Sequence, residues 1–137
     1  MLLLDTNVIS ELRKGRNANG NVLAWASEVG HTEMFISVIS VMELRIGILR
    51  LKRKDIQQAT MLNNWMTKQV LPTFENNILS IDLAVANQCA ALHVPNPCSE
   101  RDALIAATAM VHGLCIVTRN ISDFKATNAS TLNPWTL

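Results

Sequence analysis

The sequence is poor in aromatic side chains, which form 4% of its 137 residues and include no tyrosine. Leucine, isoleucine, valine, alanine and methionine must therefore fill the core of any fold that the chain adopts. Hydrophobic residues make up 49% of the chain and charged residues 17%, a balance that argues against intrinsic disorder. A chain of this length is expected to form one domain with a sizeable core.

The chain also lacks the features of secreted and membrane proteins. Its three cysteines (Cys89, Cys98 and Cys115) have no C-x-x-C spacing, so neither a disulfide framework nor a zinc site is predicted. No apolar run is long enough to span a bilayer, and no charged segment precedes an apolar stretch as in a signal peptide. We therefore expect a cytoplasmic protein without membrane contact. No P-loop or G-x-G-x-x-G fingerprint indicates nucleotide-driven work.

Short apolar runs of strand type alternate with helical patterns. The predicted strands are residues 1–5, 33–38, 78–81 and 114–117, with a short fifth at 131–132. The predicted helices are residues 8–12, 21–30, 40–51, 55–70, 82–92 and 99–112. Such alternation predicts a parallel sheet with helices on both faces.

Polar residues and proline set the expected ends of these helices. Thr6 or Asn7 is the expected N-cap of the first helix, Asn21 that of the second, and Asp82 that of the helix that follows the third strand. Pro72 is expected to stop the helix over residues 55–70.

Four acidic residues stand where a predicted strand passes into a helix or turn. They are Asp5, Glu43, Asp102 and Asp123. Ligands of parallel α/β sheets bind outside the carboxyl ends of the strands, so these acids are expected to meet at one edge. The chain has a net charge of +1, and because the four acids carry −4, the rest of it carries +5. An acidic centre in a basic surround suits a metal site that handles a polyanion.

Clustered carboxylates repel each other unless a cation lies between them, and hard divalent cations prefer oxygen ligands. Such a cation neutralises a phosphodiester and lowers the pKa of an attacking water. We expect Asp5 and Asp102 to be direct ligands, with Glu43 and Asp123 as ligands or water-orienting groups. Thr118 can hydrogen-bond the carboxylates or the metal waters, as can Asn7.

Each acid also has a structural interpretation when it is taken alone. Ser40-x-x-Glu43 has the spacing of a capping box, and Ser99-x-x-Asp102 is a similar box. Asp5 could cap the helix that follows it, and Asp123 could be a turn residue. A fifth acid, Glu11, follows Asp5 by under two helical turns and is the best candidate for an additional acid near the site.

The four acidic motifs, taken in order, resemble those of the PIN-domain ribonucleases over essentially the whole chain. More narrowly, they are similar to the VapC toxins of bacterial toxin–antitoxin pairs, in the FitB-like branch. The motifs are Leu2-Leu3-Leu4-Asp5-Thr6-Asn7, Ser40-Val41-Met42-Glu43-Leu44, Arg101 to Ala109, and Thr118 to Phe124.

This resemblance implies one PIN domain over residues 1–137, a three-layer α/β/α sandwich with a parallel sheet of four to five strands. It implies an endoribonuclease that uses Mg²⁺ or Mn²⁺, with its four acids on Asp5, Glu43, Asp102 and Asp123. The family's polar helper positions match Asn7, Thr118 and Asn120. Some members of the family carry an additional acid where this chain has Asn120.

The resemblance also implies partners. They are an RNA substrate, an antitoxin whose C-terminal segment blocks the pocket, and a second copy of the chain, with DNA reached only through the antitoxin. The apolar, methionine-containing helices around residues 41–66 could bury the homodimer interface. Arg101 and Arg119 adjoin two of the motifs and could bind RNA phosphates or balance the acids. The sequence shows no aromatic platform for stacking bases.

Two other functions compete with this one. In an aspartyl phosphotransferase or phosphatase of doubly wound fold, Asp5 would be the nucleophile. The chain lacks a second aspartate two residues after Asp5 and the lysine expected after the strand before Asp123. A non-catalytic binding module with the same fold is the other alternative, and the presence of all four acids speaks against it.

Overall fold

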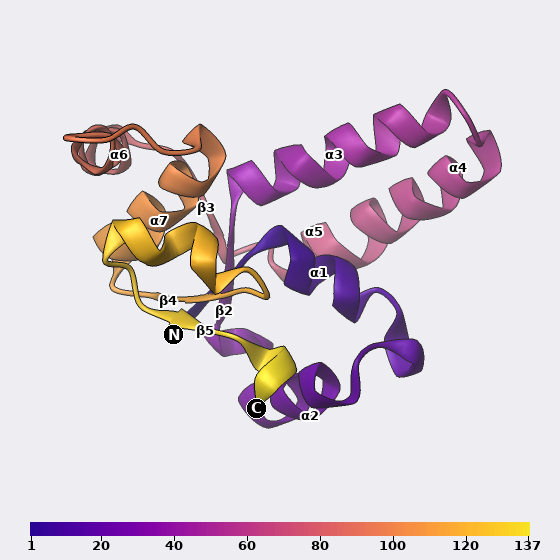
Figure 1. The fold of residues 1–137 in the computed structure, drawn as a ribbon. Helices are drawn as coiled ribbons and strands as arrows, with labels where there is room; N and C mark the ends of the chain where they lie inside the picture. The colour runs from indigo at the N-terminus through magenta and orange to yellow at the C-terminus, as the bar shows by residue number, and fades with distance from the viewer.

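The computed structural model describes residues 1–137 and has a five-stranded parallel sheet at its centre (Figure 1). The strands lie in the order β3-β2-β1-β4-β5. Their bounds are Leu2–Leu4 for β1, Met34–Ser37 for β2, Ile78–Leu79 for β3, Cys115–Val117 for β4 and Thr131–Leu132 for β5. All four neighbouring pairs are parallel, which confirms the predicted type of sheet, including its short fifth strand.

Helices precede or follow each strand. Their bounds are Thr6–Leu12 for α1, Gly20–Val29 for α2, Val38–Lys52 for α3, Ile56–Trp65 for α4, Leu71–Thr73 for α5, Leu83–Leu92 for α6 and Glu100–His112 for α7. The 3-10 turns span Gly15–Asn17, His31–Glu33, Ile121–Thr127 and Pro134–Thr136. Figure 1 shows α3 and α4 as a hairpin that extends away from the sheet. None of the helices combines the length and the apolar character that crossing a membrane requires.

The central strand β1 separates two cores. Successive side chains of a strand point to opposite faces of the sheet, and both Leu3 and Leu4 are fully buried. Leu4 belongs to a cluster built from helices α1 to α5, with Val8 of α1 among its members. Leu3 belongs to a cluster on the other face, built mainly from α7 and the 3-10 turn Ile121–Thr127. The helices therefore cover both faces of the sheet, and the three-layer α/β/α sandwich is confirmed.

The first two helices begin earlier than the sequence predicted. Asp5 is the N-cap of α1, so Thr6 and Asn7 are helical residues and not caps. Asn19 caps α2 by accepting hydrogen bonds from the N–H groups of Asn21 (2.9 Å) and Val22 (3.3 Å), which corrects the prediction of an Asn21 cap. In both segments several residues of cap-forming type stand within three positions, and composition alone does not choose among them.

The start of α3 changes the interpretation of Glu43. Ser37, the last residue of β2, caps α3 through a hydrogen bond from the Ile39 N–H to its hydroxyl oxygen (3.0 Å). Ser40 therefore lies inside the helix, and the capping box predicted from Ser40-x-x-Glu43 does not form. In α7, Ser99 occupies the N-cap position but its side chain makes no capping hydrogen bond.

Two further boundaries differ from prediction. The chain stays helical through Pro72, because a π-helical turn over Met66–Val70 precedes a new short helix, α5, and Pro72 stands in its first turn. The last π-helical bond runs from the Leu71 N–H to the Met66 carbonyl, and Pro72, which has no N–H, comes directly after it. The third strand pairs over two residues only, Ile78 and Leu79, where four were predicted. Asp82 caps α6 as predicted.

Candidate active site

The carboxyl ends of β1, β2 and β4 bring the four acids to one edge of the sheet. Asp5 follows β1 directly, and Glu43 lies in the second turn of α3, which follows β2. Asp102 lies in the first turn of α7, and Asp123 in the first turn of the 3-10 segment after β4. The four positions thus come from four segments that span 119 residues of sequence, from 5 to 123.

Asp5 is at the centre of a hydrogen-bond network. It is only 8% exposed, and its carboxylate accepts hydrogen bonds from the Thr6 N–H (2.9 Å), the Thr118 hydroxyl (2.8 Å) and the Asn7 amide (3.1 Å). The Thr118 hydroxyl accepts in turn from Asn7 (3.2 Å) and from the backbone N–H of Asn120 (3.0 Å). These bonds tie β1 to the segment after β4 and fix the direction of the Asp5 carboxylate.

The acids share an electric field. Burial raises the pKa of Asp5 above its ordinary value of 3.8, and the negative charges of Glu43 and Asp123 raise it further, against hydrogen bonds from Thr118 and Thr6 that lower it. The pKa of Asp102 is also raised, first by burial and then by Asp123, Asp5 and Glu43. All four carboxylates therefore interact, as the sequence-based hypothesis of one acidic site requires.

Glu43 is oriented by two contacts. The Thr6 hydroxyl donates to one of its carboxylate oxygens (2.8 Å) and also lies 3.0 Å from the Ser40 hydroxyl oxygen. The other carboxylate oxygen lies 3.6 Å from the guanidinium of Arg101. Arg101 is therefore paired with one of the four acids in this structure. The sequence reasoning missed Thr6, for which the only signal was its position between Asp5 and Asn7.

The segment after β4 places the remaining polar residues. The Arg119 N–H donates to Asn7 Oδ1 (3.1 Å), so Asn7 bridges Asp5 and this segment. The Asp123 N–H donates to the carbonyl of Asn120 (3.0 Å), which gives Asp123 the turn geometry considered for it. The Asn120 side chain makes no capping hydrogen bond. The predicted helper positions thus surround Asp5, while Asn120 contributes through its backbone.

The donor set has the chemistry that a hard divalent cation prefers, since every candidate ligand is an oxygen. No three His, Cys, Asp or Glu side chains lie together in an arrangement that could hold a metal ion directly. Glu43 is turned toward Thr6 and Arg101, and Asp5 already accepts three hydrogen bonds. Mg²⁺ keeps several of its waters, so carboxylates that share a field can hold it partly through water. Asp5, which is buried, and Asp102, which is partly exposed, repel each other and fit such a group.

Glu11 is not a member of this cluster. Its carboxylate accepts from the Asn19 N–H (2.9 Å) and pairs with Lys14 (3.0 Å), so it joins the end of α1 to the start of α2. The hydrogen bond from Asn19 and the contact with Lys14 lower the pKa of Glu11. Its burial is explained by this structural role.

Comparison with known proteins places the chain in a family. A family model for the PIN domain matches residues 2–129. The chain therefore belongs to the PIN domain family, whose nucleases are generally metal-dependent.

Individual relatives cover nearly the whole chain. It is 36% identical to the plasmid stability protein StbB of Pseudomonas syringae, over 98% of this chain and 99% of that one. It is 35% identical to the VapC ribonuclease Y4jK of Sinorhizobium fredii, over 98% of each chain. It is 34% identical to the toxin FitB of Neisseria gonorrhoeae, over 98% of this chain and 99% of that one.

A solved structure has the same fold. The crystal structure of FitAcB from Neisseria gonorrhoeae superimposes with a TM-score of 0.90 at 34% identity, and the match covers 100% of both chains.

Proposed function

We propose that this protein is a metal-dependent endoribonuclease and the toxin of a toxin–antitoxin pair, with residues 1–137 forming one PIN domain. The observation that carries the proposal is the acidic edge, where burial and mutual repulsion raise the pKa of both Asp5 and Asp102. Relatives named as a VapC ribonuclease and as a toxin support the same activity. We also propose that it acts in the cytoplasm, where an RNA substrate would be available.

The contacts of each residue suggest its role. Asp5 and Asp102 would hold Mg²⁺ or Mn²⁺, with Glu43 and Asp123 as further ligands or as acceptors for bound water. When bound, such an ion neutralises the phosphate and lowers the pKa of the attacking water. Thr118 and Asn7 hold the Asp5 carboxylate in one orientation by donating to the same oxygen, Oδ2. The Thr6 hydroxyl does the same for Glu43.

Asp5 is poorly placed for the competing role of phosphotransferase nucleophile. Both of its oxygens accept hydrogen bonds, which fix the orientation of the carboxylate and make it a weaker nucleophile. No lysine donates to the cluster. The network is better suited to hold a ligand of fixed position than to attack a phosphate.

The proposal is tested by Asp5→Asn and by Asp102→Asn. Cleavage of a mixed-sequence RNA in Mn²⁺ should fall by at least about a hundredfold in each variant, since each loses a ligand charge. The circular dichroism spectrum should keep its native form. Full cleavage by a clean Asp5→Asn preparation, or by the unaltered protein in excess EDTA, would contradict the proposal.

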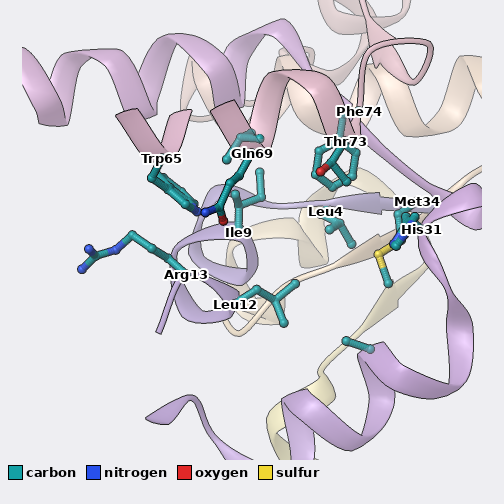
Figure 2. Close-up of a pocket in the computed structure, with 12 residues that line it drawn as sticks. Leu4, Ile9, Leu12, Arg13, His31, Met34, Trp65, Gln69, Thr73 and Phe74 are labelled. Carbon is teal, nitrogen blue, oxygen red and sulfur yellow. The ribbon is translucent and has the colours of Figure 1, made fainter. Parts of the chain in front are cut away.

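We further propose that an antitoxin segment occupies an apolar groove beside this site, because solved relatives are toxin–antitoxin complexes. Figure 2 shows the groove between α1 and α4, with Trp65 and Gln69 directed toward α1. Leu12 lies on its floor and Arg13 at its mouth. Arg13 and Trp65 also line a second hollow that reaches Glu43, so a segment in the groove can extend to the acids.

Leu12→Asp should abolish co-purification of the antitoxin and leave RNA cleavage intact. Retained co-purification would exclude the groove as the antitoxin site.

The proposed homodimer has a candidate surface on the α3–α4 hairpin. One side of each helix packs into the core, with Leu44 and Ile48 of α3 buried. The other side leaves Leu49 and Met61 more than half exposed. Exposed apolar side chains of this size are typical of interaction surfaces when they occur together.

A further inference from the structure

The C-terminal segment, residues 133–137, lies outside the part of the chain that the PIN family model matches, yet it is bonded to α2 and to the segment after β4. Asn133 Oδ1 accepts from the Trp135 N–H (2.9 Å), and Asn133 Nδ2 donates to the carbonyl of Arg119 (3.4 Å). Asn21 of α2 donates to the carbonyl of Trp135 (2.7 Å). In Figure 1 this segment is the yellow turn beside α2. Its backbone is therefore held from two sides.

These bonds place the Trp135 ring next to the side chain of Arg119. The guanidinium carbon lies over the indole at 5.4 Å from the ring centroid, within the range of a cation–π contact. Stacking uses the flat face of a guanidinium and leaves its five N–H groups free along the edge. Arg119 is exposed, and its side chain takes part in no hydrogen bond or ion pair.

The guanidinium groups of the two arginines next to the acidic motifs thus have different partners. Arg101 is paired with Glu43 at 3.6 Å. The backbone of Arg119 is two hydrogen bonds away from Asp5, through Asn7, and its guanidinium is held by an aromatic ring and not by a carboxylate. Glu11 feels the charge of Arg119 but is already paired with Lys14. An exposed cation without a carboxylate partner therefore stands on the segment after β4, whose backbone is bonded to Asn7.

We propose that Trp135 is a positioning residue that holds Arg119 ready to bind a backbone phosphate of single-stranded RNA, next to the phosphate that is cut. This inference rests on the proposed function and refines it, because it assigns RNA contact to Arg119 and charge balance to Arg101. An acidic edge repels a polyanion, so a flanking cation is needed to keep the strand in place. The planar guanidinium binds phosphate with two parallel hydrogen bonds, which a fixed orientation favours.

A double-mutant cycle tests the inference in a background that binds RNA without cutting it. Asp5→Asn would carry Arg119→Gln, Trp135→Leu or both, and a fluorescent single-stranded RNA of mixed sequence would be titrated in EDTA over a range of KCl. Arg119→Gln should weaken binding and reduce the slope of log K against log salt by about 0.7, the value for one phosphate of a single strand. Trp135→Leu should weaken binding about two- to fivefold.

The decisive result is the coupling between the two substitutions. Trp135→Leu should have no further effect once Arg119→Gln is present, because the ring acts through the guanidinium. Trp135→Phe should retain most of the binding, since phenylalanine keeps an aromatic face. The control is Arg53→Gln, which removes an equal charge at the far end of α3. Thermal unfolding of each variant checks that the partly buried Trp135 can be replaced without loss of the fold.

Three outcomes would overturn the inference. The first is an equal loss of binding from Trp135→Leu with and without Arg119. The second is failure of Trp135→Phe to retain binding in a folded protein. The third is an Arg119→Gln variant that behaves like any charge loss, with an unchanged salt slope or with a loss of affinity that Arg53→Gln equals. Failure of the proposed function can be distinguished from failure of this inference. If the protein is not a ribonuclease, the unaltered protein will neither cut RNA in Mn²⁺ nor bind it. A protein that cuts RNA while the cycle shows no coupling would lose only the role of Trp135.

Discussion

Thr118 shows how single side chains organise the candidate site. Its hydroxyl is fully buried, donates to Asp5, and accepts from both Asn7 and the Asn120 N–H. Three groups from two ends of the chain therefore depend on one oxygen atom. Partners that orient a ligand in this way typically change metal affinity or activity by about ten- to a hundredfold when they are removed.

Thr118→Val should therefore lower RNA cleavage by about ten- to a hundredfold, with a loss of about 1–3 kcal/mol in the free energy of unfolding from the unpaired polar groups. The matched control is Thr108→Val, because Thr108 is also fully buried but donates only to the Leu104 carbonyl within α7. Cleavage rates at saturating metal and urea denaturation check both effects. Equal loss of cleavage in the two variants would show that Thr118 has no special role.

The raised pKa values of Asp5 and Asp102 predict how stability depends on pH. Each carboxyl keeps its proton to higher pH in the folded state than in the unfolded state, where its pKa has the ordinary value of 3.8. The folded state therefore binds more protons than the unfolded state in the pH window just above 3.8. Stability of the metal-free protein should therefore fall as pH rises through this window. Addition of Mn²⁺ at neutral pH should restore it, because binding to the folded state stabilises that state.

Asp102→Asn removes part of this effect and serves as the comparison. The metal-free variant should gain about 0.5 kcal/mol relative to the unaltered protein between acidic and neutral pH, a small value because solvent screens the partly exposed group. It should also respond less to Mn²⁺. Urea denaturation in EDTA at several pH values measures the difference. Parallel pH profiles for the two proteins would exclude repulsion at Asp102.

At the scale of helices and strands, the sequence predicted the alternation correctly and misplaced several starts. Period and composition located all five strands, because buried parallel strands are short apolar runs bounded by polar residues. Three successive segments offered several residues that can cap a helix, and the choice depended on where the preceding strand ended. Ser37, the last residue of β2, is the cap of α3, which moved Ser40 into the helix. The contact of Glu43 with Thr6 follows from tertiary packing, which no local pattern encodes.

Ser37→Ala should therefore destabilise the protein by about 1–2 kcal/mol, since the Ile39 N–H loses its only side-chain partner at a buried helix start. Ser40→Ala should cost less than about 1 kcal/mol, because Ser40 caps nothing and the Thr6 hydroxyl is the one side-chain hydrogen-bond partner of its hydroxyl. A capping box at Ser40 would predict the opposite order. Urea denaturation of the two variants decides between these assignments of the helix start.

At the scale of the whole molecule, the α3–α4 hairpin is the part least supported by the sheet. It extends from the body in Figure 1 and exposes Leu49 by 62% and Met61 by 68%. The sequence identified these helices as apolar, but periodicity could not separate residues of the core from residues of an interface. The structure makes that separation, because Leu44 and Ile48 are buried in the same helix as Leu49.

If this hairpin forms the proposed dimer, Leu49→Lys combined with Met61→Lys should yield a monomer, because two charges would be buried without partners. Leu83→Lys is the control, since Leu83 is 77% exposed on α6, away from the hairpin. Light scattering after size-exclusion chromatography gives the mass of each variant. A double variant with the mass of the unaltered protein would rule out this surface.

The position of β1 in the middle of the sheet also sets when the protein can become active during synthesis. A ribosome that has made the first hundred residues has released Asp5 and Glu43, but not Asp102, Thr118 or Asp123. The partner strand β4 and the hydroxyl that orients Asp5 arrive more than a hundred residues after Asp5 itself. Contacts between such distant residues form late and slowly in folding. A nascent chain would therefore stay harmless to the messenger that encodes it, which gives a cognate partner time to be made before the nuclease is complete.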